Sequence, residues 1–283
     1  MTSLTITPHA NNFGACIEGL NLAAGLNEDE VAALRAAWLD HQVIYLPNQP
    51  LEHDQLERFT RCFGEHGTDP YVKAIDGHQH ILEVRREADE EVAPFGSGWH
   101  SDWSFQPEPP AATILHAKVV PPHGGDTLYA DGIRAFEALD PGFAAELETL
   151  MTVHSARLPY SHEGYIKTGS DKRKGMKILP NDNAWDTQLH PLIRTHPESG
   201  RKALWVNPVY TIGIDGMGET EAQALLARLF EHLLQPVFIY THHWSADMLT
   251  MWDNRSALHC AQGGYDGYQR VMHRTTVAGT APA

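Results

Sequence analysis

Residues 96–105 have the sequence GSGWHSDWSF, in which a histidine and an aspartate stand two positions apart among aromatic residues. Aromatic residues that follow a glycine-containing loop are typical of a strand, so we predict a strand entered from a loop here. Alternate side chains of a strand share a face, which would bring His100 and Asp102 together and turn Ser101 away. An imidazole and a carboxylate placed in this way can form an ion pair, a base with its orienting acid, or two ligands of one metal.

The segments on either side of this stretch predict a fold of many short strands and few helices. We expect strands at 42–49, 80–86, 111–120, 125–131, 200–208, 238–244, 247–253 and 269–279, with a strand pair within 1–25. We expect helices after the cap residue Asn27 and at 52–63, 136–150 and 219–235. Such a pattern favours a mainly β fold with flanking helices, a sandwich or jelly roll, over alternating β-α-β winding.

No linker or internal repeat divides the chain, so we predict a single domain over residues 1–283. Residues 155–188 form a polar stretch that is too long for an ordinary connection, and such segments are more often functional. We therefore expect a lid at about 155–188. The basic residues 172–174 within it are interpreted as a solvated face that can also steer anions inward.

The composition excludes several classes of partner. A net charge of −15 argues against nucleic acid or an anionic membrane surface, because both require basic patches. No apolar segment approaches the length of a membrane span, and the first residues lack the pattern of a secretory signal. The 3 cysteines are widely spaced, which fits a reducing compartment, so we expect a cytoplasmic protein.

The metal interpretation of His100 and Asp102 requires a third ligand from elsewhere in the chain. The C-terminal segment MWDNRSALHC offers His259. Two histidines and one carboxylate leave half of an octahedral coordination sphere open, which suits Fe(II) and O₂ chemistry. An isolated His-x-Asp is weak evidence, because such short motifs are common.

Two arginines near the C-terminus strengthen the argument. In QRVMHRTTV, Arg270 and Arg274 share a strand face with Met272 and lie about 13 Å apart. Arginines that point inward are costly unless each meets an anion, and the guanidinium fork suits a carboxylate or sulfonate. Thr127, after a Gly-Gly turn, offers a hydroxyl that can share an anion with one of them.

Taken together, these residues resemble a known family, the Fe(II)/2-oxoglutarate-dependent dioxygenases of the taurine dioxygenase and 2,4-dichlorophenoxyacetate dioxygenase group (TauD/TfdA). The resemblance covers nearly the whole chain and is sharpest in 99–131, 190–204, 251–262 and 269–279. It implies a double-stranded β-helix fold. It also implies that His100, Asp102 and His259 bind iron, that Thr127 and Arg270 hold the distal carboxylate of 2-oxoglutarate, and that Arg274 faces the anionic group of the substrate.

The resemblance further implies Fe(II), 2-oxoglutarate and O₂ as cofactors and a small anionic molecule as substrate. Hydroxylation of that substrate would accompany decarboxylation of 2-oxoglutarate to succinate and CO₂. Asp102 argues against a halogenase, in which a small residue replaces the carboxylate. Relatives commonly form dimers or tetramers, so we also expect a homo-oligomer.

Three positions bear on the substrate. Asp69 stands where the taurine enzyme presents a histidine to the sulfonate, and Gly96 stands where that enzyme has an asparagine. Tyr210 matches an aromatic position of the pocket. A carboxylate repels a sulfonate, so we expect a carboxylate substrate rather than taurine. Asp69 has an equally good interpretation as the residue that opens a turn before Pro70.

Three alternatives remain open at this point. The protein can be a taurine or alkylsulfonate dioxygenase proper. A zinc hydrolase uses similar ligands but needs no arginine at the far end of a cofactor slot. A non-catalytic jelly-roll binding protein would need none of the iron and 2-oxoglutarate residues.

Overall fold

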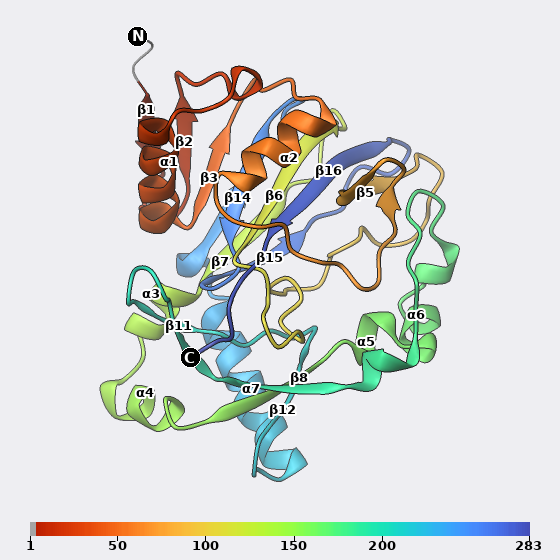
Figure 1. The fold of residues 1–283 in the computed structure, drawn as a ribbon. Helices are drawn as coiled ribbons and strands as arrows, with labels where there is room; N and C mark the ends of the chain where they lie inside the picture. The colour runs from red at the N-terminus through yellow and green to blue at the C-terminus, as the bar shows by residue number, and fades with distance from the viewer. Residues whose placement is uncertain (1–3) are drawn as a thin grey trace.

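Eight strands form the main sheet, in the order β1-β2-β3-β14-β6-β16-β5-β4 (Figure 1). The computed structural model describes residues 4–283 of the chain. The strands of this sheet are β1 (Thr5–Pro8), β2 (Ala15–Glu18), β3 (Val43–Leu46), β4 (Ala74–Ile75), β5 (His78–Arg86), β6 (Ala112–Val119), β14 (Leu249–Asp253) and β16 (Arg270–Val277). Neighbouring strands are antiparallel except for the parallel pair β2 and β3.

Three smaller sheets complete the β structure, with strand orders β13-β7-β15, β12-β8-β9 and β10-β11. Their strands are β7 (Thr127–Asp131), β8 (Met151–Ser155), β9 (Thr187–Pro191), β10 (Ile193–Thr195), β11 (Lys202–Leu204), β12 (Thr211–Ile214), β13 (Ile239–His242) and β15 (Ala257–Ala261). The predicted fold class, a mainly β jelly roll of the double-stranded β-helix type, is confirmed.

The central strands β6, β14 and β16 are buried along almost their whole length, so both faces of the main sheet are covered. On its inner face, Leu115 of β6 and Met272 of β16 pack with Tyr129 of β7. On its outer face, Ile114 of β6 packs with Trp38, which belongs to a covering helix. The polar site residues lie in the inner layer between the main sheet and the β13-β7-β15 sheet.

Helices lie around the outside of the sheets (Figure 1). The α-helices are α1 (Glu28–His41), α2 (His53–Arg61), α3 (Gly132–Glu137), α4 (Pro141–Leu147), α5 (Arg157–Tyr160), α6 (His162–Lys167) and α7 (Glu219–Leu233), and the 3₁₀ turns are η1 (Leu22–Ala24), η2 (Ser170–Lys172), η3 (Asp182–Trp185) and η4 (Pro236–Phe238). The first helix begins where the sequence predicts, because Asn27 and Glu30 form a capping box. The segment predicted as one helix at 136–150 contains only the last two residues of α3 and all of α4, and Asp140 caps the second helix.

Residues 155–188 contain α5, α6, η2 and η3, and they lie below the main sheet at the lower right of Figure 1. A buried carboxylate fastens this segment to the loop after β5. Glu90 accepts hydrogen bonds from the backbone N–H groups of Lys174 and Gly175, and Lys174 also forms an ion pair with Asp89 at 2.6 Å. The segment is therefore structured, and its interpretation as a lid stays a prediction.

The strand predicted at 96–105 is wrong. Only His100 pairs with another strand, as an isolated bridge to His259, and a turn follows directly. Trp103 adopts a left-handed φ of 48°, which an extended strand does not allow. The turn is stabilised through Ser101, whose hydroxyl donates to the backbone oxygen of Asn254 at 2.6 Å. His100 and Asp102 are thus brought together by a bridge and a turn instead of by strand alternation.

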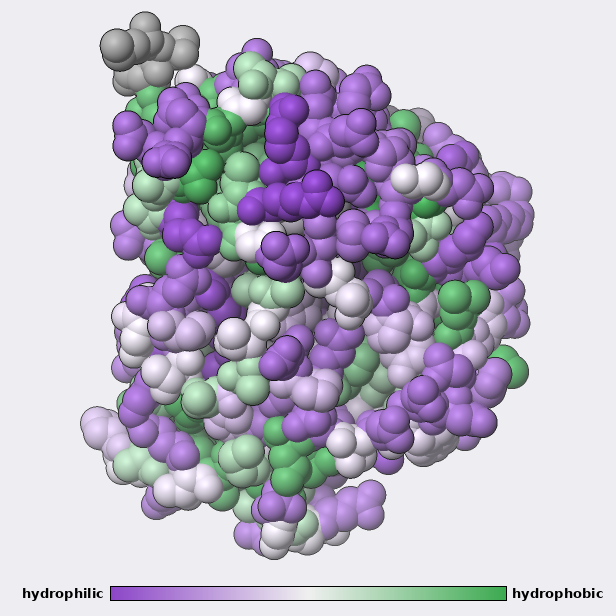
Figure 2. Space-filling model, viewed as in Figure 1, coloured by the Kyte–Doolittle hydropathy of each residue, from purple (hydrophilic) through white to green (hydrophobic). Residues whose placement is uncertain are grey.

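The face of the molecule in Figure 2 is mostly hydrophilic, and its hydrophobic residues lie in small separate groups. This distribution agrees with the acidic net charge of −15. Among the described residues 4–283, no helix is long and apolar enough to cross a membrane.

Candidate active site

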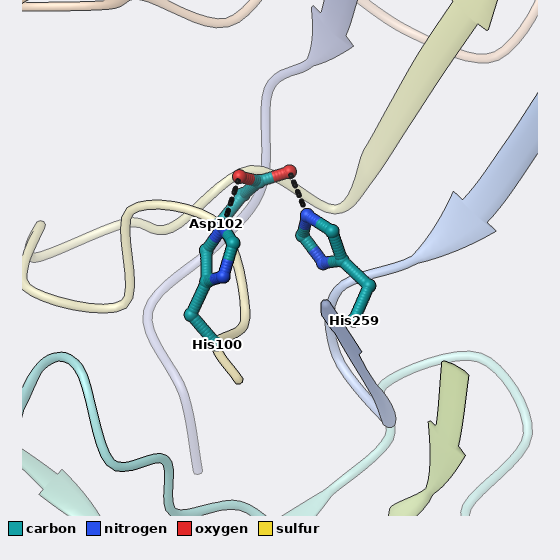
Figure 3. A group of neighbouring side chains, drawn as sticks. All are labelled: His100, Asp102 and His259. Atoms are coloured by element: carbon teal, nitrogen blue, oxygen red, sulfur yellow. Dashed lines mark ion pairs between the residues drawn. The ribbon is translucent and has the colours of Figure 1, made fainter. Parts of the chain in front are cut away.

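His100, Asp102 and His259 meet in the buried layer between the main sheet and the β13-β7-β15 sheet (Figure 3). The Nε2 atom of His100 lies 3.5 Å from Oδ1 of Asp102, and Nε2 of His259 lies 3.8 Å from Oδ2 of the same carboxylate. The backbones of the two histidines exchange hydrogen bonds of 3.0 and 2.8 Å, which fixes their spacing. The structure therefore brings together the three residues that the sequence predicts as metal ligands.

Both imidazoles present a free ring nitrogen to the centre of the site. Nδ1 of His100 lies 2.7 Å from the backbone oxygen of Gly98 and donates to it, so Nε2 is the ring nitrogen directed toward Asp102. Burial, together with the neighbouring His100, lowers the pKa of His259 well below its ordinary value. The neutral imidazole of His259 is the form that binds a metal ion.

Asp102 is held by two polar neighbours. The hydroxyl of Thr113, on β6, donates to Oδ2 of Asp102 at 2.6 Å. The side chain of Asn254 donates to the Thr113 hydroxyl at 2.9 Å and accepts from the backbone N–H of Asp102 at 3.3 Å. The carboxylate orientation is thus set before any metal binds.

The charge of Asp102 is balanced by cationic and imidazole groups. Burial by itself would raise the pKa of this carboxyl group, but the Arg274 guanidinium and the two histidines hold it well below its usual range. Nη2 of Arg274 lies 3.0 Å from Oδ1 of Asp102. Asp102 is therefore ionised, as a metal ligand must be.

A second ion pair, next to the triad, fixes the turn between β14 and β15. Arg255 forms two hydrogen bonds with the carboxylate of Asp253, at 2.8 and 2.7 Å, and His196 lies 2.9 Å from the same group. Because Asn254 and His259 follow Asp253 closely in the chain, this buried network positions both. The turn itself spans residues 254–256, directly after Trp252 and Asp253 at the end of β14.

A narrow cavity extends from the triad to the second predicted pair, Thr127 and Arg270. Arg270 is buried, and its Nε and Nη2 atoms have no hydrogen-bond partner. Burial lowers the pKa of Arg270, and no carboxylate lies within ion-pair distance among residues 4–283. Thr127 accepts a hydrogen bond from Trp244 at 3.0 Å, so its own hydroxyl proton is free to be donated. A buried, unpaired guanidinium next to a free hydroxyl is suited to a carboxylate.

A wider cavity of about 220 Å³ opens on the other side of His100. Tyr210 lines this cavity, and its ring lies 5.9 Å from the ring of His100. The remaining walls are mostly apolar and come from the loop before His100 and from the 155–188 segment.

The other two predicted substrate residues do not line the wider cavity. Arg274 lies in the narrow cavity with the triad, and its guanidinium stacks over Trp103 at 4.4 Å. Oδ1 of Asp69 accepts hydrogen bonds from the backbone N–H groups of Tyr71 and Val72, which is the turn role that the sequence suggests. Their assignment to substrate binding stays a prediction.

Sequence reasoning missed two groups that bear on the site. Thr113 lies in an apolar strand, where a threonine is an ordinary residue, and only its contact with Asp102 identifies it. Arg173 was interpreted as part of a solvated basic face, yet it lines the wider cavity. Neither position carries a local signal that distinguishes it from a strand threonine or a surface cation.

A second group of potential ligands, Asp54, Glu57 and His78, lies between α2 and β5. His78 is within 3.8 Å of Asp54 and 3.5 Å of Glu57. The Asp54 side chain is 90% exposed, and the group lies at the rim of a surface hollow instead of in a buried layer. An ordinary surface ion pair accounts for it.

A jelly roll with a buried His-Asp-His site and a cationic slot beside it defines a class of mononuclear non-haem metal oxygenases. The sequence matches the family described as "Taurine catabolism dioxygenase TauD, TfdA family" over residues 5–276. The chain belongs to this family and is a 2-oxoglutarate-dependent dioxygenase.

Curated relatives and solved structures agree with this membership. The chain is 32% identical to an (S)-phenoxypropionate/alpha-ketoglutarate-dioxygenase of Sphingobium herbicidovorans, covering 97% of this chain and 94% of the relative. It is 30% identical to an alpha-ketoglutarate-dependent sulfate ester dioxygenase of Pseudomonas putida, covering 99% and 91%. A taurine dioxygenase from Burkholderia xenovorans superposes with a TM-score of 0.83 at 30% identity, covering 99% and 91%. The AAD-2 structure with Mn(II) and N-oxalylglycine superposes with a TM-score of 0.81 at 30% identity, covering 99% of both chains.

Proposed function

We propose that this dioxygenase hydroxylates a small anionic organic substrate, a carboxylate in preference to a sulfonate, coupled to the conversion of 2-oxoglutarate to succinate and CO₂. The observation that carries the proposal is the buried triad next to the unpaired guanidinium of Arg270. A zinc hydrolase would have no use for that guanidinium, and a non-catalytic binding protein would need neither the triad nor the guanidinium.

The residues present fit Fe(II) and 2-oxoglutarate. Oδ1 of Asp102 is buried without a hydrogen bond, and Nε2 of each histidine faces the same carboxylate, so the donor set suits a divalent metal. Bound Fe(II) would supply O₂ activation and oxidation of a C–H bond.

The protein would contribute orientation and shielding. Arg270 and Thr127 would hold the distal carboxylate of 2-oxoglutarate, which directs its other end toward His100, Asp102 and His259. The apolar layer around the narrow cavity, which includes Trp252 of β14, excludes water from the reacting groups.

Two considerations support a carboxylate substrate with an apolar body. The cavity beside His100 is lined mainly by apolar and aromatic side chains, Tyr210 among them. The relative from Sphingobium herbicidovorans is named for phenoxypropionate, a carboxylate attached to an aromatic ring. We assign the wider cavity, which Tyr210 lines, to such a molecule. We assign the end of the narrow cavity at Arg270 to 2-oxoglutarate.

The test is anaerobic reconstitution with Fe(II) and 2-oxoglutarate, followed by a screen of carboxylates, sulfonates and sulfate esters for stimulated succinate release. We expect 2-phenoxypropionate to stimulate release more than taurine does. Efficient turnover of taurine would overturn the preference for carboxylates and favour the alkylsulfonate alternative. Preference for an alkyl sulfate would instead favour a sulfate ester substrate, as named for the relative from Pseudomonas putida. No succinate release with Fe(II), together with hydrolysis of a test substrate in the presence of Zn(II), would favour a hydrolase.

A further inference from the structure

Resting on the proposed function, we propose that Arg173 of the 155–188 segment binds the anionic group of the substrate in the cavity beside His100. The substrate would then be an amphipathic anion, with its apolar body against the aromatic wall and its charged end at Arg173. Neither the sequence resemblance nor the site described above assigns this residue a role.

Arg173 differs from the two lysines that flank it. Lys172 is exposed, and Lys174 is paired with Asp89 outside the cavity. The Arg173 side chain instead lines the cavity, where its guanidinium carbon lies 5.9 Å from the centre of the Phe95 ring. The middle member of the basic cluster is thus turned inward.

The guanidinium of Arg173 has unused hydrogen-bonding capacity. Its Nη2 donates to the backbone oxygen of Ala93 at 2.9 Å, whereas its Nε is buried without a partner. No ion pair joins it to a carboxylate within the described part of the chain. The nearby Glu90 does not supply one, because its oxygens already accept hydrogen bonds from the backbone N–H groups of residues 87, 174 and 175.

An unpaired guanidinium that is largely removed from water is favourable only when an anion compensates for its lost hydration. Of the two arginines beside the triad, Arg274 lies 3.0 Å from the carboxylate of Asp102, and Arg270 is assigned above to 2-oxoglutarate. The charge of Glu90 acts on Arg173, but no carboxylate forms an ion pair with it in the described part of the chain. Arg173 therefore offers a guanidinium in the wider cavity that an anion can still pair with.

The remaining walls of the cavity define what the anionic group must be attached to. Most of the walls of the cavity are apolar or aromatic side chains, such as Phe95, Tyr160 and Tyr210. Ser97, Thr168 and Ser170 add hydroxyl groups. Since His100 and Arg173 line the same cavity of about 220 Å³, one small molecule can touch both. An aryloxyalkanoate or an alkyl anion of similar size has the required combination of an apolar body and one charged end.

The experiment compares an acid with its neutral amide. Protein loaded with Mn(II) and N-oxalylglycine is titrated calorimetrically with 2-phenoxypropionate and with 2-phenoxypropionamide, for wild type, Arg173→Met, Arg173→Lys and Lys172→Met. We expect Arg173→Met to lower the affinity for the acid about 10- to 100-fold and to change the affinity for the amide little. Arg173→Lys should retain part of the preference, and Lys172→Met, which removes the same charge from the exposed neighbour, should behave like wild type.

The ratio of the two affinities separates binding of the anion from a purely structural role. If Arg173 only fastened the segment to Ala93, acid and amide would lose affinity equally, and that result would overturn the inference. An unchanged acid preference in Arg173→Met would also overturn it while leaving the proposed function intact. A wild-type protein that binds the acid no better than the amide would contradict the proposed anionic substrate class itself. Circular dichroism of each variant checks that the fold is retained.

Discussion

At the scale of single residues, we expect each of His100, Asp102 and His259 to be needed for metal binding. His100→Ala, Asp102→Ala and His259→Ala should each abolish tight Fe(II) binding, because no other described carboxylate or imidazole completes the set. Anaerobic titration with Fe(II), with unfolding curves as the check on folding, measures this. The control is His78→Ala, in the exposed group beside α2, which should bind iron as wild type does. A triad variant that keeps wild-type affinity would remove that residue from the metal site.

The hydroxyl of Thr113 bonds to Asp102, so we expect it to act on a bound metal only through that carboxylate, as a positioning residue. Thr113→Val preserves shape but removes the 2.6 Å hydrogen bond to Oδ2. Loss of such an outer partner typically lowers metal affinity about 10- to 100-fold, and we expect a loss in that range. Thr275→Val is the matched control, because Thr275 is buried in the same sheet but bonds to Thr60 on the other face. Equal iron affinities for the two variants would contradict the positioning role.

Arg270 carries the prediction about 2-oxoglutarate. Arg270→Leu removes a charged partner of the distal carboxylate, and such hydrogen bonds contribute about 1.5–3 kcal/mol. The dissociation constant of 2-oxoglutarate should therefore rise about 10- to 100-fold, whereas iron affinity should change little. Arg85→Leu removes the same charge from the adjacent strand, where Arg85 pairs with Glu87 outside the cavity. If both variants weakened 2-oxoglutarate equally, net charge rather than a specific contact would be responsible.

The sequence predicted these residues unevenly, for a physical reason. Arg270 and Arg274 stand at even spacing in one strand, so their common inward face follows from strand geometry alone, and both are buried in the structure. The environment of Thr113 and Arg173 depends on contacts between segments far apart in the chain. No local pattern encodes such contacts, so these two emerge only from the folded structure.

At the scale of elements, the buried carboxylate of Glu90 is one of the contacts that fasten the 155–188 segment. Glu90→Ala would leave the backbone N–H groups of Lys174 and Gly175 without their acceptor. Losing these bonds should raise the open population of the segment about tenfold or more, and tryptic cleavage within 167–174 should accelerate accordingly. The exposed neighbour variant Glu91→Ala should be cleaved at the wild-type rate. Unchanged cleavage in Glu90→Ala would mean that other contacts hold the segment.

Element boundaries were predictable where a local signal existed. Asn27 marks the start of α1 in the sequence, and in the structure it forms a capping box with Glu30 at that point. The stretch around His100 misled, because its aromatic content predicts a strand whereas the left-handed Trp103 imposes a turn. That turn is stabilised by bonds to Asn254, about 150 residues away, which tertiary structure alone supplies.

At the scale of the whole molecule, buried neutral histidines couple stability to pH. Burial lowers the pKa of His116 and of His190 from 6.5 to about 4 in the folded protein. In the unfolded chain both take up a proton near pH 6.5. Their contribution to the free energy of unfolding is therefore complete above pH 6.5 and is lost as the pH falls toward 4.

Asp69 has the opposite effect on the free energy of unfolding in the same pH range. Burial raises its pKa from 3.8 to about 6, even though Arg274 opposes the shift. Protonation of Asp69 in the folded protein therefore favours the folded state as the pH falls from 6 toward 4. Asp131 adds to the effect of Asp69, because burial raises its pKa too. More buried histidines oppose them, since burial also lowers the pKa of His154 and His242, so we expect a net loss of stability with acid.

Urea unfolding of the metal-free protein between pH 7.5 and 4.5 tests this balance. The free energy of unfolding of the wild type should fall below pH 6.5, and each buried histidine contributes a slope of up to about 1.4 kcal/mol per pH unit. His116→Gln should flatten the profile, because a glutamine does not titrate, whereas Asp69→Asn should steepen it between pH 6 and 4. The control His162→Gln, whose side chain is 67% exposed, should leave the profile unchanged. A His116→Gln profile parallel to that of wild type would show that this imidazole is not the group coupled to unfolding.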